Sequence, residues 1–250
     1  MDMVEAYMIC TAPRSGSTLL CRMLGDTGVA GQPQSYFFEQ TPAEWASKHG
    51  GGPVGDPPSR TDLARVFAAI RDTGRGSTDL FAVRMQAPNL PGFRAGLAQF
   101  LPDLAGDVAR INRVFGAMRY VHLHRADKVA QAVSYLRAQQ SGLWHRHADG
   151  SELERLSPPA RPLYDAEAIA ERVAMFEAYD AAWETWFAAE GVNPLRLDYG
   201  ALSHDPGGTL GQVLAYLGLD PDLAQGIAPS VKRLADAESA EWIARFRGTA

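Results

Sequence analysis

Residues 13–20 read Pro-Arg-Ser-Gly-Ser-Thr-Leu-Leu and join two segments of opposite character. Residues 6–10 (AYMIC) precede them and form a short apolar run, as expected of a buried parallel strand. Residues 17–24 (STLLCRML) follow and repeat leucine and methionine at helical spacing. The pattern therefore predicts a strand, a tight loop and a helix, with the loop at the helix N-terminus.

The loop carries groups suited to an anion. Backbone N–H groups at a helix N-terminus converge on one point, where the helix dipole adds positive potential. Gly16 permits close backbone approach, Ser15, Ser17 and Thr18 add hydroxyl donors, and Arg14 adds a permanent charge with forked donors. We predict a phosphate-like ligand here. The alternative is an ordinary strand–turn–helix connection capped by a serine.

The loop differs from the Walker A motif, G-x-x-x-x-G-K-[ST]. Thr11 stands at its first glycine position and Ser17 at its lysine position. The lysine that reaches a γ-phosphate is therefore lacking, and Asp198 is only a weak candidate for a magnesium-holding strand end. These differences disfavour an NTPase or kinase and favour a shorter phosphoanhydride held by positive side chains. An atypical P-loop kinase stays open as an alternative.

A second anion-binding element follows residues 120–124 (YVHLH), a predicted strand. This strand runs into Arg125, and Ser134 lies nine residues later on a helix predicted over 127–140. Ligands of open α/β sheets bind at the carboxyl ends of the strands, where Arg125 can hold a second phosphate bidentately. The alternative for Arg125 is a surface ion pair with Asp127.

The rest of the chain extends this alternation of strands and helices. Further strands are predicted over 80–85 and 194–199, and further helices over 61–71, 165–190 and 206–217. Such alternation predicts an α/β fold, a parallel β-sheet with flanking helices. The 250 residues fit a single domain over 1–250, in which 50–60 (GGGPVGDPPSR) forms a flexible loop.

Composition narrows the class of protein. Hydrophobic residues make up 46% and charged residues 21%, which favours a packed core. The net charge of −5 argues against a nucleic-acid partner. Cys10 and Cys21 form neither a disulfide framework nor a metal pattern. We find no signal peptide or transmembrane segment, so we expect a cytoplasmic protein.

The same motifs resemble those of the sulfotransferase superfamily. P-R-S-G-S-T-L-L resembles its 5′-phosphosulfate loop, and H-R-x(8)-S its 3′-phosphate motif. Four segments between residues 6 and 242 are similar to the bacterial trehalose 2-sulfotransferase family: AYMICTAPRSGSTLL, TGVAGQPQ, HLHRADKVAQAVSYLRAQQSGLW and RLADAESAEW. The resemblance implies a P-loop-like sulfotransferase fold. It also implies 3′-phosphoadenosine 5′-phosphosulfate as sulfuryl donor, no metal, and a small carbohydrate or glycolipid acceptor.

The resemblance assigns roles to single residues. Those from Arg14 to Thr18 would hold the 5′-phosphosulfate, with Arg14 also catalytic, and Arg125 and Ser134 would hold the 3′-phosphate. Tyr199 resembles a family tyrosine near that phosphate, although a strand-end aromatic is its structural alternative. Arg233 falls in a loop expected to close over the nucleotide, although it also fits a surface base. A homodimer is left open.

The general base is the point at which the chain departs from the family. The trehalose enzyme has a glutamate after G-x-P that is proposed as the base, and this chain has Ser35 there. Glu39 is the only carboxylate in 32–39, so we predict Glu39 as the base, against the alternative of a solvated side chain. His122 and His124 are next in line. The departure leaves the acceptor open, and with it the alternative of a nucleotide-binding protein with altered catalysis.

The remaining histidines and tryptophans are considered as metal ligands, sugar-stacking groups or core residues. The pairs His122/His124 and His145/His147 lack a third ligand at a recognisable spacing, so no metal site is predicted. Trp144 is expected in a loop with His145 and Arg146, where it can stack on a sugar ring. Trp183 and Trp186 lie in a helical pattern and are predicted to be in the core.

Overall fold

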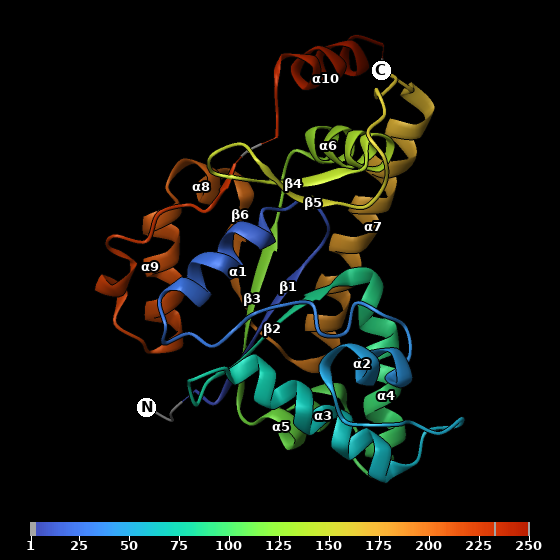
Figure 1. Cartoon of the computed structure of the whole chain (residues 1–250), viewed down its shortest axis with the longest axis vertical. Coiled ribbons are helices and arrows are strands. Elements are labelled where there is room, and N and C mark those ends of the chain that lie inside the picture. The colour runs from blue at the N-terminus through green and yellow to red at the C-terminus, as the bar shows by residue number, and fades with distance from the viewer. Residues whose placement is uncertain (1–3, 233, 250) are drawn as a thin grey trace.

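Four parallel strands form the central sheet (Figure 1). The computed structural model describes residues 4–232 and 234–249. Within that range the strands are β1 (Ala6–Thr11), β2 (Phe81–Gln86), β3 (Met118–His124) and β6 (Leu195–Asp198), in the order β2-β1-β3-β6. All neighbouring pairs are parallel. The predicted parallel α/β fold is confirmed.

Helices cover both faces of the sheet, because alternate residues of β1 enter different cores. Tyr7 and Ile9 pack with α1 (Ser17–Asp26) and α9 (Pro206–Leu217). Met8 and Cys10 point to the opposite face of the sheet and pack in a different core. Every residue of β1 is buried. An uninterrupted apolar run is therefore what this strand needs.

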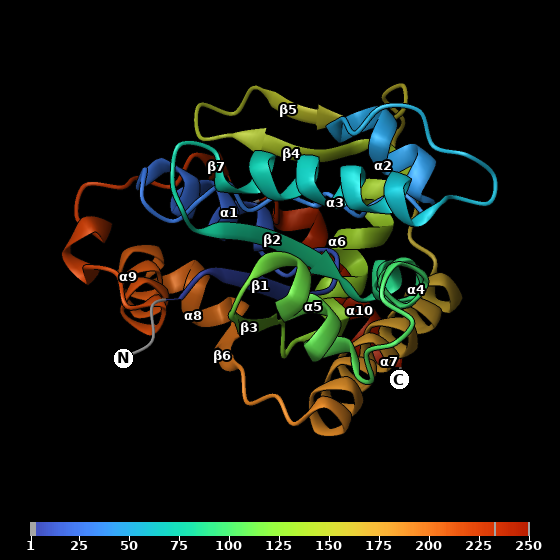
Figure 2. The same ribbon diagram turned by 90° about the horizontal axis from the view of Figure 1, so that it is seen from below.

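The core that contains Met8 and Cys10 is completed by four helices that lie between α1 and β3 in the chain and by one long helix. They are α2 (Pro42–His49), α3 (Arg60–Arg75), α4 (Leu90–Phe100), α5 (Asp107–Phe115) and α7 (Ala166–Glu190). Trp183 and Trp186 of α7 are buried there, as predicted. Figure 2 shows α3 lying along β2, with α7 and α9 on opposite sides of the sheet. In the described ranges, every helix is too short or too polar to cross a bilayer.

The start of α3 differs from its prediction. We expected Thr61 and Asp62 to cap the helix, but Ser59 is the N-cap and Asp62 completes a capping box with it. The Ser59 hydroxyl accepts from the Asp62 N–H at 3.1 Å, and the Asp62 carboxylate accepts from the Ser59 N–H at 3.0 Å. The preceding loop contacts α3, since Arg65 donates to the Pro53 carbonyl at 2.9 Å. Its flexibility stays a prediction.

A second, antiparallel sheet lies at the carboxyl ends of the parallel strands. It contains β4 (Leu143–His147), β5 (Glu152–Arg155) and β7 (Val231–Lys232), in the order β5-β4-β7. In Figure 1, β4 and β5 lie beside the ends of β1 and β3, next to α6 (Lys128–Ser141). The predicted loop at Trp144 to Arg146 is wrong, because these residues form β4.

Candidate anion and nucleotide site

The loop after β1 presents its backbone N–H groups to a ligand. Arg14 and Gly16 both have positive φ, 64° and 83°, which turns the chain sharply before α1. In the described part of the chain, the N–H groups of residues 14 and 16–18 donate no hydrogen bond to protein. Gly16 is the N-cap of α1, and no side chain caps this helix. The alternative of a serine-capped turn is therefore wrong, and the arrangement is typical of an anion cradle.

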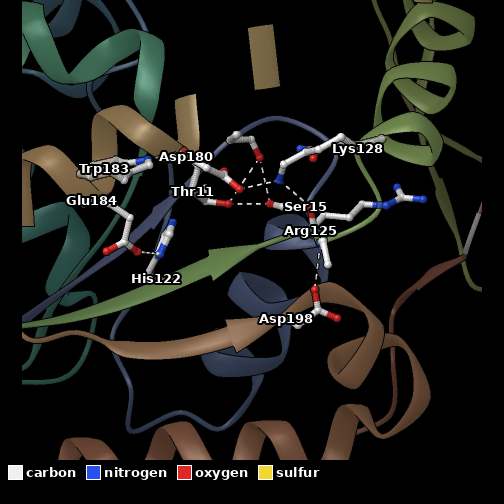
Figure 3. A network of polar contacts seen from close by, with 12 residues as sticks. Thr11, Ser15, His122, Arg125, Lys128, Asp180, Trp183, Glu184 and Asp198 are labelled. Atoms are coloured by element: carbon white, nitrogen blue, oxygen red, sulfur yellow. Dashed lines mark hydrogen bonds and ion pairs between the residues drawn. The ribbon is translucent and has the colours of Figure 1, made fainter. Parts of the chain in front are cut away.

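Buried hydroxyl groups hold the loop in this shape. The Ser15 hydroxyl donates to the Ala12 carbonyl at 2.8 Å and lies 2.5 Å from Thr11 Oγ1, which itself donates to the Leu123 carbonyl at 2.8 Å. Figure 3 shows this contact between Thr11 and Ser15. Ser15 is fully buried, so its side chain supports the loop.

The two predicted anion-binding elements meet. Arg14 Nε donates to Ser134 Oγ at 3.0 Å, and Arg14 Nη1 donates to the Trp144 carbonyl at 2.6 Å. Arg125 Nη1 donates to the Arg14 carbonyl at 3.3 Å. The Arg125 guanidinium stacks on the Tyr199 ring, 4.5 Å from its centroid. The fold thus gathers Arg14, Arg125, Ser134 and Tyr199 around one loop.

Arg14 forms no ion pair with a carboxylate of the described residues. Burial and, next, the neighbouring charge of Arg125 lower the Arg14 pKa to about 10. Asp127, the partner considered for Arg125, caps α6 by accepting from the Ala130 N–H at 3.0 Å and pairs with Arg247 at 2.8 Å. Two guanidinium groups this close favour a bound anion.

Two further arginines, which the sequence patterns did not single out, reach the same place. Arg84 of β2 donates to Ser35 Oγ at 2.8 Å and to Thr18 Oγ1 at 2.9 Å, and Arg22 of α1 donates to Ser230 Oγ at 2.9 Å. No carboxylate in the described ranges forms an ion pair with Arg14, Arg22 or Arg84. A charge inside the apolar strand Phe81–Gln86 was the available signal for Arg84.

His145 of β4 lies at the centre of these arginines. Its Nε2 is 3.2 Å from Thr18 Oγ1 and 3.4 Å from Glu154 Oε2 of β5. Burial and the charges of Arg14, Arg84 and Arg22 lower the His145 pKa to about 3, so the imidazole is neutral in the free protein. Over residues 4–232 and 234–249, no group of three histidine, cysteine or acidic side chains could hold a metal ion.

Glu39, the predicted base, is largely buried beside α2, with only 12% of its side chain exposed. Its carboxylate pairs with Lys48 of α2, and its backbone carbonyl accepts from the Trp45 indole at 2.7 Å. Within the described part of the protein it forms no hydrogen bond or ion pair with residues 14–18. Its catalytic role stays a prediction. Arg233, predicted to lie in a loop over the nucleotide, is outside the described residues.

Asp198 forms hydrogen bonds at the ends of two strands, and His122 is buried in the core. Asp198 accepts from the Gly200 N–H at 2.6 Å and from the Ala126 N–H at 3.0 Å, so it caps α8 (Tyr199–His204) and ties β6 to the end of β3 (Figure 3). His122 is buried on β3, with Glu184 Oε1 3.3 Å from its Nδ1, and burial lowers its pKa to about 4.

Comparisons with known proteins show what this chain is similar to. The sequence profile described as Stf0 sulphotransferase matches residues 6–249. Trehalose 2-sulfotransferase of Mycobacterium tuberculosis (strain ATCC 35801 / TMC 107 / Erdman) is 33% identical over 265 residues, which cover 99% of this chain and 96% of that protein. Its counterpart in Mycolicibacterium smegmatis (strain ATCC 700084 / mc(2)155) is 34% identical, with 98% and 96% covered. The sulfotransferase domain of the Synechococcus PCC 7002 olefin synthase is 15% identical, with 99% and 96% covered and a TM-score of 0.43.

Proposed function

Because this chain belongs to the Stf0 sulphotransferase family, we propose that it transfers a sulfuryl group from 3′-phosphoadenosine 5′-phosphosulfate to a hydroxyl of a small carbohydrate or glycolipid. The carbohydrate class is supported by the two relatives named trehalose 2-sulfotransferase, which match nearly the whole chain. The donor is supported by the site itself, which offers two adjoining positions for anionic groups.

One observation carries the proposal: the hydrogen bond between Arg14 and Ser134 joins the two anion positions. The loop N–H groups and Arg14 would hold a 5′-phosphosulfate, and Arg125 with Ser134 a 3′-phosphate. A cavity of about 210 Å³ lies beside Ser134 and is lined also by Arg137, Leu143 and Ser239. It would give room for part of the bound nucleotide. A ligand with one phosphate would leave one of these positions empty.

The reaction is an in-line displacement at sulfur. The acceptor oxygen forms a bond to sulfur while the bond from sulfur to the bridging phosphate oxygen breaks, and the phosphate leaves with the electron pair. The loop N–H groups and Arg14 would stabilise charge that develops on this leaving oxygen. Arg22 and Arg84, which have no carboxylate partner in the described ranges, would face the sulfuryl oxygens. Catalysis then comes mainly from positioning and from preorganised positive charge.

A choice of donors separates this function from its alternatives. The protein is incubated with trehalose or a trehalose glycolipid and either 3′-phosphoadenosine 5′-phosphosulfate or ATP with Mg²⁺, and products are identified by mass. We expect sulfated sugar with 3′-phosphoadenosine 5′-phosphosulfate and no phosphorylated sugar with ATP. Phosphorylated sugar would establish the kinase. Tight nucleotide binding with no product from either donor would support a binding protein with altered catalysis.

A further inference from the structure

A hydroxyl that attacks sulfur must lose its proton, and few side chains at this loop can take it. The hydroxyl groups of Ser35 and Ser134 are too weakly basic, and the arginines remain protonated. Among the described residues that hydrogen-bond to the side chains of 13–18, His145 alone has an ordinary pKa near neutrality. It reaches the loop from β4, which the sequence patterns did not predict as a strand.

The contacts of Thr18 place His145 Nε2 against the loop. Arg84 Nη1 can only donate, so Thr18 Oγ1 accepts from it at 2.9 Å. The Thr18 hydroxyl then has its own proton to donate, and His145 Nε2 lies 3.2 Å away. When Thr18 donates this proton, the lone pair of the neutral imidazole is on Nε2, at the loop, and the ring proton is on Nδ1.

Glu154 is placed to act after the proton has moved. Its Oε2 lies 3.4 Å from the same Nε2, where a carboxylate has no donor until the nitrogen is protonated. Once it is, the imidazolium can donate to Glu154 in a charge-assisted contact. Arg14, Arg84 and Arg22 oppose that protonation in the free protein. The negative charges of a bound donor would offset these arginines and make His145 more basic in the complex.

We propose that His145 is the general base and that Glu154 is the positioning residue that stabilises its protonated form; this rests on the proposed function. Nε2 takes the proton of the acceptor hydroxyl as the oxygen–sulfur bond forms, and the bond from sulfur to phosphate breaks. Arg84 donates to both Ser35 and Thr18, and Thr18 contacts His145. These contacts connect His145 to Ser35, the residue at the position of the family's glutamate. Glu39, by contrast, pairs with Lys48.

The variant His145→Gln tests the base directly. Glutamine keeps an oxygen that can accept from Thr18 and removes the basic nitrogen, so kcat should fall about 10²–10⁴-fold. Glu154→Gln should lower kcat less. Glu152→Gln on the same strand is the control, because Glu152 pairs with Arg155 instead. All three should keep the thermal stabilisation by adenosine 3′,5′-bisphosphate, which shows that the fold and the nucleotide site persist.

A pH profile separates a base from a structural role. With saturating donor and trehalose, kcat of the native protein should fall toward acid as His145 gains its proton, and His145→Gln should lose that acid limb. Undiminished kcat in His145→Gln, or an unchanged acid limb, would overturn the inference while the transferase function stands. A native protein that binds the nucleotide but sulfates neither trehalose nor any other sugar or glycolipid supplied would overturn both.

Discussion

The Arg14 guanidinium donates to the Ser134 hydroxyl at 3.0 Å, across 120 positions of sequence. This contact brings the loop after β1 against α6, and Arg125 completes the cluster by donating to the Arg14 carbonyl. The two ends of a bisphosphorylated nucleotide would thus be held by side chains that already touch. Ligand charge present at one end should therefore be felt at the other.

Adenosine 3′,5′-bisphosphate should stabilise the protein far more than AMP, because AMP leaves Arg125 and Ser134 without a ligand. At a concentration 100 times its dissociation constant, the bisphosphate should add about 2.7 kcal/mol to the free energy of unfolding. Thermal unfolding with each nucleotide measures this. Equal shifts would remove Arg125 and Ser134 from the 3′-phosphate site, whereas Ser134→Ala should narrow the difference between the nucleotides.

Arg14→Ala should damage turnover more than donor affinity, and Arg125→Ala should do the reverse. Arg14 would meet charge that develops on the leaving oxygen, while Arg125 would meet charge present throughout. Steady-state kcat and the Michaelis constant for the donor separate the two effects. The control is Arg60→Ala, an exposed side chain at the start of α3. An unchanged donor Michaelis constant in Arg125→Ala contradicts the assignment.

Gly16→Ala should unfold more easily than the native protein and lose nucleotide binding. An added Cβ would lie 2.6 Å from Tyr199 Cδ2, and the φ of 83° disfavours any side chain. Gly28→Ala is the matched control, since its φ is 72° but no described atom lies within 4 Å. That variant should lose only about 1–2 kcal/mol of unfolding free energy and keep its nucleotide response. Equal behaviour of the two would show that Tyr199 does not restrict Gly16.

His122 should make the protein sensitive to acid. Burial lowers its pKa from 6.5 to about 4, so both states are neutral above pH 6.5. Below pH 6.5, His122 is protonated in the unfolded chain but stays neutral in the folded protein. The free energy of unfolding therefore falls by about 2 kcal/mol by about pH 5. His122→Phe should lose that part of the dependence, as measured by chemical unfolding at both pH values. His204→Gln, on an exposed residue, should retain it; an unchanged pH dependence in His122→Phe contradicts the burial argument.

Sequence periodicity predicted the elements that carry the two anion motifs, because their signals are local. β1 is apolar along its length, and Arg125 follows β3 directly in the chain. The antiparallel sheet was missed because its strands Leu143–His147 and Glu152–Arg155 are mostly polar and only partly buried. Their side chains face a polar site as well as a core, so alternation of hydrophobic residues is weak.

Convergence through space was beyond any sequence pattern. Arg84 and His145 come from strands of two different sheets and meet at Thr18 only once both sheets are assembled. The Ser15 hydroxyl, predicted as a ligand donor, instead closes the loop against Thr11. Spacing alone indicates which residue types are near the loop, but burial and hydrogen-bond direction decide which atoms remain for a ligand.

The most direct test of the central claim follows both products of one reaction. Native protein, 3′-phosphoadenosine 5′-phosphosulfate and trehalose are combined without added metal, and the desulfated nucleotide and sulfated trehalose are quantified over time by mass spectrometry. The account predicts that both appear in equal amounts, and that Arg14→Ala suppresses them together. Release of the nucleotide with sulfate going only to water, or no release with trehalose or any other sugar supplied, would contradict it.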